Sequence, residues 1–143
     1  MNDTLFADPC NCLALRQAAR AVTALYDRHL EKAGVTASQY SLLAVIKNNP
    51  GISMQELSER MVMDRTTLVR ALKPLSRDNY VQQLPDAVNS RKLVFSLTDE
   101  GARKYTEAYA HWRQAQAEFD ANVGKSRAEA MRAELADLAR NQL

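Results

Sequence analysis

The fold is decided by residues 57–101, which read LSERMVMDRTTLVRALKPLSRDNYVQQLPDAVNSRKLVFSLTDEG. A short helical pattern is followed by a turn, and a second helix begins after Asp64, a residue type that favours the N-cap position. Two strands are predicted next, Val81–Leu84 and Leu93–Thr98, with the polar turn Pro85–Lys92 between them. The order helix, turn, helix and two-stranded hairpin is typical of a winged helix-turn-helix.

The helix that follows Asp64 has two chemically different faces. At about 100° per residue, small or aliphatic side chains fall on one side: Leu68, Ala71, Leu72 and Leu75. The opposite side carries Thr66, Arg70, Lys73 and Arg77. One interpretation is an ordinary amphipathic helix with a solvated charged face. The other is a DNA-reading face, because Arg and Lys suit phosphates and guanine edges and Thr can contact either a phosphate or a base.

The charge distribution favours the second interpretation. Residues 60–92 contain seven Lys and Arg against three Asp, a net charge of +4, whereas the whole chain has a net charge of only +2. The remaining residues therefore sum to −2. A nearly neutral chain has concentrated its positive charge on this helix and hairpin, which is the electrostatic pattern of phosphate binding.

Composition bounds the class of protein. A chain of 143 residues, rich in Ala and Leu, predicts a mainly α fold and a single domain over 1–143. Met1–Pro9 holds two aspartates and no apolar run, so no secretory signal is expected there. No stretch approaches the roughly 18 apolar residues of a membrane span. We expect a cytoplasmic protein with no membrane association, in which Cys10 and Cys12 are thiols rather than a structural disulfide.

Further helices are predicted on both sides of the 57–101 stretch. Ser38 is the expected N-cap of a helix that stops near Asn49, and Ser53 that of the helix over Met54–Met61. The outermost helices are predicted at Cys12–Ala33, Ala102–Asn122 and Ser126–Asn141. Their apolar stripes exceed what a small winged unit can cover. We therefore assign 38–101 to the winged helix-turn-helix DNA-binding part and 10–33 and 102–143 to dimerisation helices.

At these residues the chain resembles the MarR family of bacterial transcriptional regulators. The most specific parts are Met63–Arg70, which opens the second helix, and Asn89-Ser90-Arg91 followed by Leu97–Gly101 in the wing. The resemblance extends from about Leu13 to Leu138. It implies a homodimer whose first and last helices interleave. It also implies a pseudo-palindromic double-stranded operator, with the basic helix in a major groove and Arg91 in the adjacent minor groove.

The recognition helix and the wing arginine supply the expected DNA-binding residues: Arg65, Thr66, Thr67, Val69, Arg70, Lys73, Arg77 and Arg91. The chain departs from the family pattern in three places. Asn89 replaces an aspartate that holds the wing arginine, and it accepts a hydrogen bond without charge assistance. Pro74 cannot donate to the carbonyl of Arg70, so the helix is expected to kink or tighten before Arg77. Asn79 must end the helix where the family has glycine.

Two routes of regulation are open. The first is thiol-based sensing of an organic peroxide or other oxidant. Cys12 matches, in register, the reactive cysteine of the peroxide-sensing branch of the family, and Tyr26 matches one of its two tyrosines. The place of the other tyrosine is Ala37, and Cys10 is an additional cysteine. A helix N-terminus favours a thiolate. The alternative is that both cysteines are incidental residues near a chain terminus.

The second route is a small aromatic ligand, which members of the family often bind between the dimerisation helices and the winged part. The groups that could line such a cleft are Tyr26, Tyr40, Trp112 and Arg16. Each aromatic ring also has a simpler interpretation as core or interface packing.

The sequence therefore predicts a homodimeric DNA-binding transcription regulator, most readily a repressor released by an effector. One rival is a non-DNA protein-interaction module that uses the same helices. The other is a thiol enzyme, which the chain disfavours because no βαβ pattern surrounds its cysteines. We expect no enzyme activity, no metal site and no cofactor.

Overall fold

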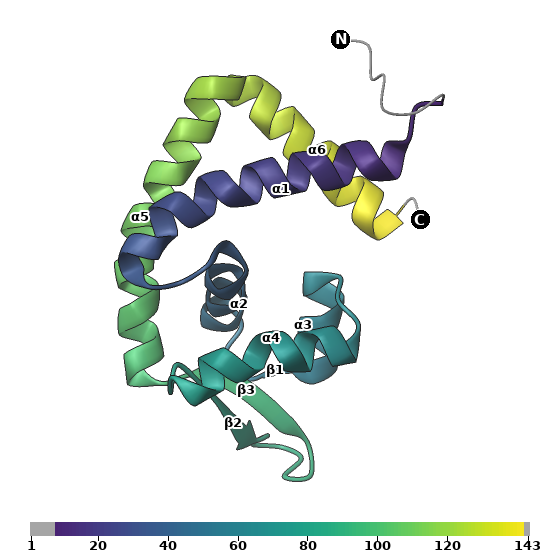
Figure 1. Cartoon of the computed structure of the whole chain (residues 1–143). Helices are drawn as coiled ribbons and strands as arrows, with labels where there is room; N and C mark the ends of the chain where they lie inside the picture. The colour runs from purple at the N-terminus through teal and green to yellow at the C-terminus, as the bar shows by residue number, and fades with distance from the viewer. Residues whose placement is uncertain (1–7, 142–143) are drawn as a thin grey trace.

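The computed structural model describes residues 8–141. Its elements are α1 (Asn11–Leu30), the 3-10 helix η1 (Glu31–Ala33), α2 (Ala37–Asn48), β1 (Ile52–Ser53), α3 (Met54–Met61), α4 (Arg65–Arg77), β2 (Val81–Pro85), β3 (Leu93–Leu97), α5 (Asp99–Val123) and α6 (Lys125–Asn141). The predicted mainly α class is confirmed. Figure 1 shows α1 and α6 at one end of the molecule and α4 with the β2–β3 hairpin at the other. Among the described residues, no helix combines the length and apolar character of a membrane span.

Local sequence signals set where α1 ends and where α2 begins. The predicted helix over Cys12–Ala33 is divided, because α1 gives way to η1 and Gly34 then turns the chain at φ 73°. The expectation that Ser38 caps α2 is wrong. Thr36 is the N-cap, its Oγ1 accepts from the Gln39 N–H at 3.1 Å, and the Gln39 side chain accepts from the Thr36 N–H at 3.0 Å. This capping box satisfies two backbone donors, which Ser38 could not do alone.

The long helix α5 begins three residues earlier than expected. Thr98 is its N-cap and accepts a hydrogen bond from the Gly101 N–H at 2.9 Å. Asp99 and Glu100 therefore lie in the first helical turn, where their charges are favourable next to the helix dipole. The resemblance had placed both residues in the wing, within Leu97–Gly101, whereas they belong to the helix.

The sheet has three strands in the order β1-β3-β2, rather than a two-stranded wing alone. Ile52 pairs with Phe95, and Ser53 with Val94, so these two residues form an edge strand that was not predicted from the sequence. Ser53 is also the N-cap of α3, as predicted, and accepts from the Glu56 N–H at 3.1 Å. Phe95 is 2% exposed and lies in the core with Leu42, Leu43, Ile46, Leu57, Leu68 and Leu75.

The left-handed residue that ends α4 matches the sequence prediction, whereas the expected kink or tightening at Pro74 stays a prediction. The helix continues through Pro74 to Arg77, and Asn79 then takes φ 61°, the left-handed conformation expected of it. The Tyr80 N–H donates to the Leu75 carbonyl at 2.8 Å, which closes the helix end. Only Asp78, Asn79 and Tyr80 separate α4 from β2, and the Tyr80 bond ties this short link back to the helix.

Candidate nucleic-acid interface

The helix α4 is fixed by a carboxylate at its start and by leucines along its inner side. The Asp64 Oδ1 accepts a hydrogen bond from the Thr67 N–H at 2.7 Å, and this bond holds the pKa of Asp64 below its usual value. The residues that α4 buries are Leu68, Leu72 and Leu75. Because these leucines set the rotation of the helix, its other side faces solvent.

That outer side carries all of the α4 residues expected to contact DNA, and each is exposed: Arg65, Thr66, Thr67, Val69, Arg70, Lys73 and Arg77. Among these residues, Arg77 forms an ion pair, because its Nε lies 3.4 Å from the Asp78 Oδ1. Their exposure makes the surface available to a duplex, and their individual contacts with DNA stay predictions.

The turn before α4 has an unusual backbone. Val62 is left-handed, with φ 52° and ψ 47°, a conformation that a β-branched residue rarely adopts. Its N–H donates to the Glu59 carbonyl at 3.3 Å, and the Met63 N–H donates to the Ser58 carbonyl at 3.1 Å. These bonds end α3 abruptly. The sequence gives no sign of this turn, because position 62 is a valine and not a glycine or asparagine.

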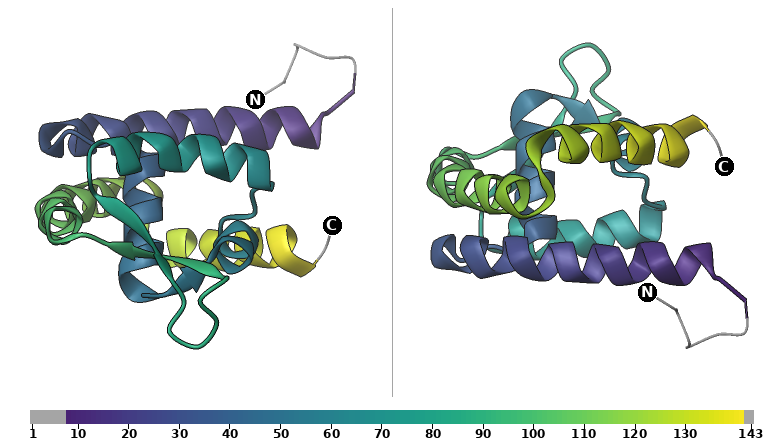
Figure 2. Two further views of the ribbon diagram at one scale, coloured as in Figure 1. Left: turned by 90° about the horizontal axis from the view of Figure 1, so that it is seen from below. Right: turned by 90° about the horizontal axis from the view of Figure 1, so that it is seen from above.

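The loop of the hairpin is held by two of its own side chains. The Asp86 Oδ2 accepts from the Asn89 N–H, and the Asn89 Oδ1 accepts from the Arg91 N–H, both at 3.2 Å. The Asp86 N–H donates to the Lys92 carbonyl at 2.8 Å. Asn89 thus holds the backbone of Arg91, as expected despite the missing aspartate. Both views of Figure 2 show this loop projecting from the body of the molecule.

A groove of about 530 Å³ connects the hairpin with the helix-turn-helix. It brings Arg65 of α4 together with Arg91 and Lys92 of the wing. Other polar residues line it that the sequence analysis had not selected: Gln55, Glu56, Glu59 and Gln83. Three cations from two separate elements therefore share one surface.

A second cavity, of about 210 Å³, lies between α1, α2 and α5. It contains three of the four residues expected to line a ligand cleft, Tyr26, Tyr40 and Trp112, but not Arg16. The Tyr40 and Trp112 rings stack at 5.8 Å between centroids. Burial and the neighbouring Tyr105 raise the pKa of Tyr40, so its phenol stays neutral. The other residues of the lining are Val22, Thr23, Leu30, Ala37 and Ser41.

The two cysteines lie at the start of α1, and both are exposed. Cys10 is the N-cap and its Sγ accepts from the Leu13 N–H at 3.4 Å, whereas Cys12 lies inside the helix. Tyr26 is fourteen residues further along α1, roughly 21 Å at the helical rise. Its hydroxyl donates to the Gln116 side chain of α5. Within one chain, therefore, Tyr26 does not approach Cys12.

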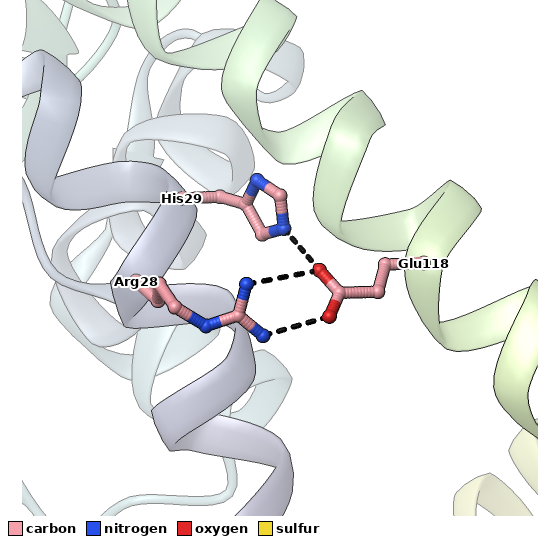
Figure 3. A network of polar contacts seen from close by, with 3 residues as sticks. All are labelled: Arg28, His29 and Glu118. Atoms are coloured by element: carbon pink, nitrogen blue, oxygen red, sulfur yellow. Dashed lines mark hydrogen bonds and ion pairs between the residues drawn. The ribbon is translucent and has the colours of Figure 1, made fainter.

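A polar network that the sequence analysis missed joins α1 to α5 (Figure 3). The Glu118 carboxylate accepts two bonds from the Arg28 guanidinium, at 2.7 and 3.2 Å, and also pairs with the His29 Nε2. The bonds from Arg28 and then His29 lower the pKa of Glu118 to about 2. The network fixes how the end of α1 crosses α5. No local pattern could reveal it, because its members are about 90 residues apart.

The basic outer side of α4, the sharp turn before it and the projecting hairpin define a winged helix-turn-helix protein. The MarR family model matches residues 33–92. This chain is similar to the M. tuberculosis transcriptional regulator MosR, whose crystal structure was solved in complex with DNA. The two sequences are 36% identical. That comparison has a TM-score of 0.82 and covers 92% of this chain and 95% of MosR. The chain belongs to the MarR family, which consists of transcription regulators and not of enzymes.

Two curated relatives give a similar result. YybA of Bacillus subtilis, an uncharacterized HTH-type transcriptional regulator, is 34% identical over 87 residues, which are 61% of this chain and 58% of YybA. The Escherichia coli homoprotocatechuate degradative operon repressor is 28% identical over 113 residues, 76% of each chain. The chain thus spans less than two thirds of YybA.

Proposed function

We propose that this protein is a DNA-binding transcription repressor that acts as a homodimer. The observation that supports it best is the exposed basic side of α4, whose first residue, Arg65, lines the same groove as Arg91 of the wing. A major groove admits an α-helix, and a narrow minor groove attracts arginine. The DNA complex of MosR and the repressor from E. coli support the same function by similarity.

The dimer is proposed to form through α1, α5 and α6. Within the described chain, α1 buries only Leu30 of its 20 residues, and α6 only Ala128 of its 17. Large apolar side chains of these helices face solvent, among them Leu15, Val22 and Leu135. Covering such side chains is favourable by about 25 cal/mol per Å². A two-fold dimer requires a pseudo-palindromic operator whose half-sites are about 34–36 Å apart.

To test DNA binding, the genomic DNA fragments that the protein retains are first sequenced to find a sequence that they have in common. Fluorescence anisotropy then measures the affinity of the protein for a duplex with that sequence. Arg70→Ala is expected to weaken binding by about 1–3 kcal/mol if it contacts a base edge. Affinity should also fall steeply with salt, because phosphate contacts release counterions.

A matched control removes the same charge elsewhere. The double variant Arg70→Ala, Lys73→Ala loses two cations from α4, and the double variant Lys32→Ala, Lys47→Ala loses two exposed cations from η1 and α2, outside the proposed dimer helices. Only the first should lose specific binding. Equal affinity in the two double variants, or binding that does not depend on salt, contradicts the assignment of α4 to the major groove.

We propose the cavity between α1, α2 and α5 as the effector site, and an uncharged aromatic molecule as its ligand. An engineered apolar cavity of about 150 Å³ holds benzene, so 210 Å³ accommodates one substituted ring. None of the eight lining residues carries a charge, and the polar groups are the hydroxyls of Thr23, Tyr26 and Ser41, besides that of Tyr40. Because burying a carboxylate without a cation is costly, a neutral ligand is favoured.

Trp112, the single tryptophan, makes this ligand class measurable without DNA. Acetophenone and benzoate have similar shapes and differ by one charge, and acetophenone should change Trp112 fluorescence at lower concentration. Ser41→Lys, on the rim of the cavity, should shift the preference towards benzoate. Ser38→Lys, on the same helix but outside the lining, should not. A wild-type preference for benzoate contradicts the proposed ligand class.

Oxidation of Cys12 is the rival route of regulation. Its support is the exposed position of both thiols at the N-terminus of α1, where an oxidant can reach them. If this route operates, an organic hydroperoxide releases DNA from the wild type but not from Cys12→Ser, with Cys10→Ser as the comparison. A wild-type complex that survives peroxide leaves the small-ligand route.

A further inference from the structure

Lys104 of α5 is tied to the end of the first helical segment. Its side chain is only 20% exposed, and its Nζ donates to the Ala33 carbonyl at 2.9 Å. Ala33 is the last residue of η1 and is 2% exposed. A carbonyl at a helix C-terminus has no partner within the helix, and a cation is favourable there. Lys104 also pairs with Glu107 at 3.0 Å, but the Glu107 side chain is 52% exposed, so this pair contributes little.

The same ammonium group also reaches Tyr80, in the short link between α4 and β2. Its Nζ lies 5.9 Å from the centroid of the Tyr80 ring, within the range of a cation–π interaction. Tyr80 is the third residue after α4, and its N–H donates to the Leu75 carbonyl inside that helix. A force on Tyr80 therefore acts on the C-terminal end of α4.

The start of α5 holds Tyr80 at a second point. The Thr98 N–H donates to the Tyr80 carbonyl at 3.0 Å, and the Thr98 hydroxyl donates to the Asn79 carbonyl. Gly101 approaches so closely that a Cβ there would lie 1.9 Å from the Tyr80 oxygen. Gly101 and Lys104 are three residues apart and lie on one side of α5. The first turn of α5 thus contacts the backbone of Tyr80 through Gly101, and the second turn contacts the Tyr80 ring through Lys104.

We propose that Lys104 is a positioning residue that fixes the orientation of α4 relative to the dimerisation helices, by joining the end of η1 to Tyr80. The inference rests on the proposed function as a DNA-binding dimer. In such a dimer, the angle at this joint in each copy sets the separation of the two recognition helices. Lys104 should therefore control which half-site spacing the dimer accepts, while the contacts of each α4 with its own half-site do not depend on it.

The test compares a full operator, operators with one base pair inserted or deleted between the half-sites, and a duplex with one half-site. Lys104→Met keeps the aliphatic stem and loses the charge. It should reduce the preference of the wild type for the correct spacing by roughly 2- to 30-fold, the range that coupling mutations span. Half-site affinity should change less than about twofold, within the error of additive surface substitutions. Lys104→Arg keeps a cation and donors and should restore the preference, and Lys47→Met, at an exposed position of α2, is the charge-matched control.

Two results overturn the inference. In one, Lys104→Met discriminates spacing as the wild type does. In the other, half-site and full-operator affinities fall equally, which indicates a purely structural role. If Lys104→Met does not fold, Tyr80→Leu removes only the aromatic face and is read by the same criteria. A wild-type protein that binds no operator overturns the proposed function itself, and a wild type that binds operators of every spacing equally overturns the inference alone.

Discussion

Gly101 offers the sharpest test of how α5 is joined to the recognition unit. A Cβ at this position would lie 1.9 Å from the Tyr80 oxygen and 2.8 Å from the Tyr80 carbonyl carbon. Non-bonded heavy atoms are most stable at about 3.5–4.0 Å, so in Gly101→Ala the helix or the carbonyl must move by more than about 1 Å. The obstacle is backbone, which cannot rotate away as a side chain would.

Two effects of Gly101→Ala oppose each other. Alanine is a better helix former than glycine by about 1 kcal/mol. Overpacking costs about 1–3 kcal/mol, with the upper end expected against fixed backbone. Displacing Tyr80 also strains its hydrogen bond from the Thr98 N–H, a loss of about 1 kcal/mol. The clash wins, and Gly101→Ala should lower the free energy of unfolding by roughly 3 kcal/mol, or the Tm by roughly 10 °C.

Urea denaturation followed by circular dichroism measures this loss, at one protein concentration because dimer stability depends on it. Gly34→Asn is the control: Gly34 has φ 73° with nothing within 4 Å of its Cβ position, and asparagine tolerates that backbone. It should change the stability by less than about 1 kcal/mol. A Gly101→Ala protein as stable as the wild type, or more stable, would refute the reasoning.

Three further outcomes are expected. Arg91→Ala should lower DNA affinity about tenfold and weaken a preference for A·T-rich flanks, with a smaller loss in Asn89→Ala, which removes only the bond to the Arg91 backbone; anisotropy measures both. Because the pKa of Glu118 falls from 4.5 to about 2 on folding, its stabilising effect should be complete above about pH 4.5 and disappear towards pH 2. Urea denaturation of the wild type and Glu118→Gln across that range measures it, and a constant difference contradicts the network. Val62→Gly should relieve left-handed strain and raise the free energy of unfolding by up to about 1 kcal/mol, so a loss of stability argues against strain.

Local chemistry explains what the sequence could predict. The N-caps Ser53 and Asp64 and the left-handed Asn79 were found because each depends on a residue type and its nearest neighbours in the chain. The exposed and buried sides of α4 follow from helical periodicity alone. The predicted DNA-binding residues were accordingly found exposed, although their contacts are untested.

Long-range contacts explain what it could not. The Arg28–His29–Glu118 network and the bond from Tyr26 to Gln116 join residues about 90 positions apart. A two-residue strand such as β1 has no period to detect, and it exists only because β3 pairs with it. The N-cap of α2 was predicted wrongly for another reason. Thr36 and Ser38 are both good caps, and only the reciprocal bond from Gln39 decides between them.

Ser53 belongs to two structures at once, since it pairs with Val94 in the sheet and caps α3 with its hydroxyl. If the pairing between β1 and β3 opens, Ser53 moves and α3 loses its N-cap. Native-state hydrogen exchange should therefore report β3 and the first turn of α3 as a single cooperative opening unit. DNA that holds the wing would then slow amide exchange in α3 as well, even where α3 itself touches no phosphate.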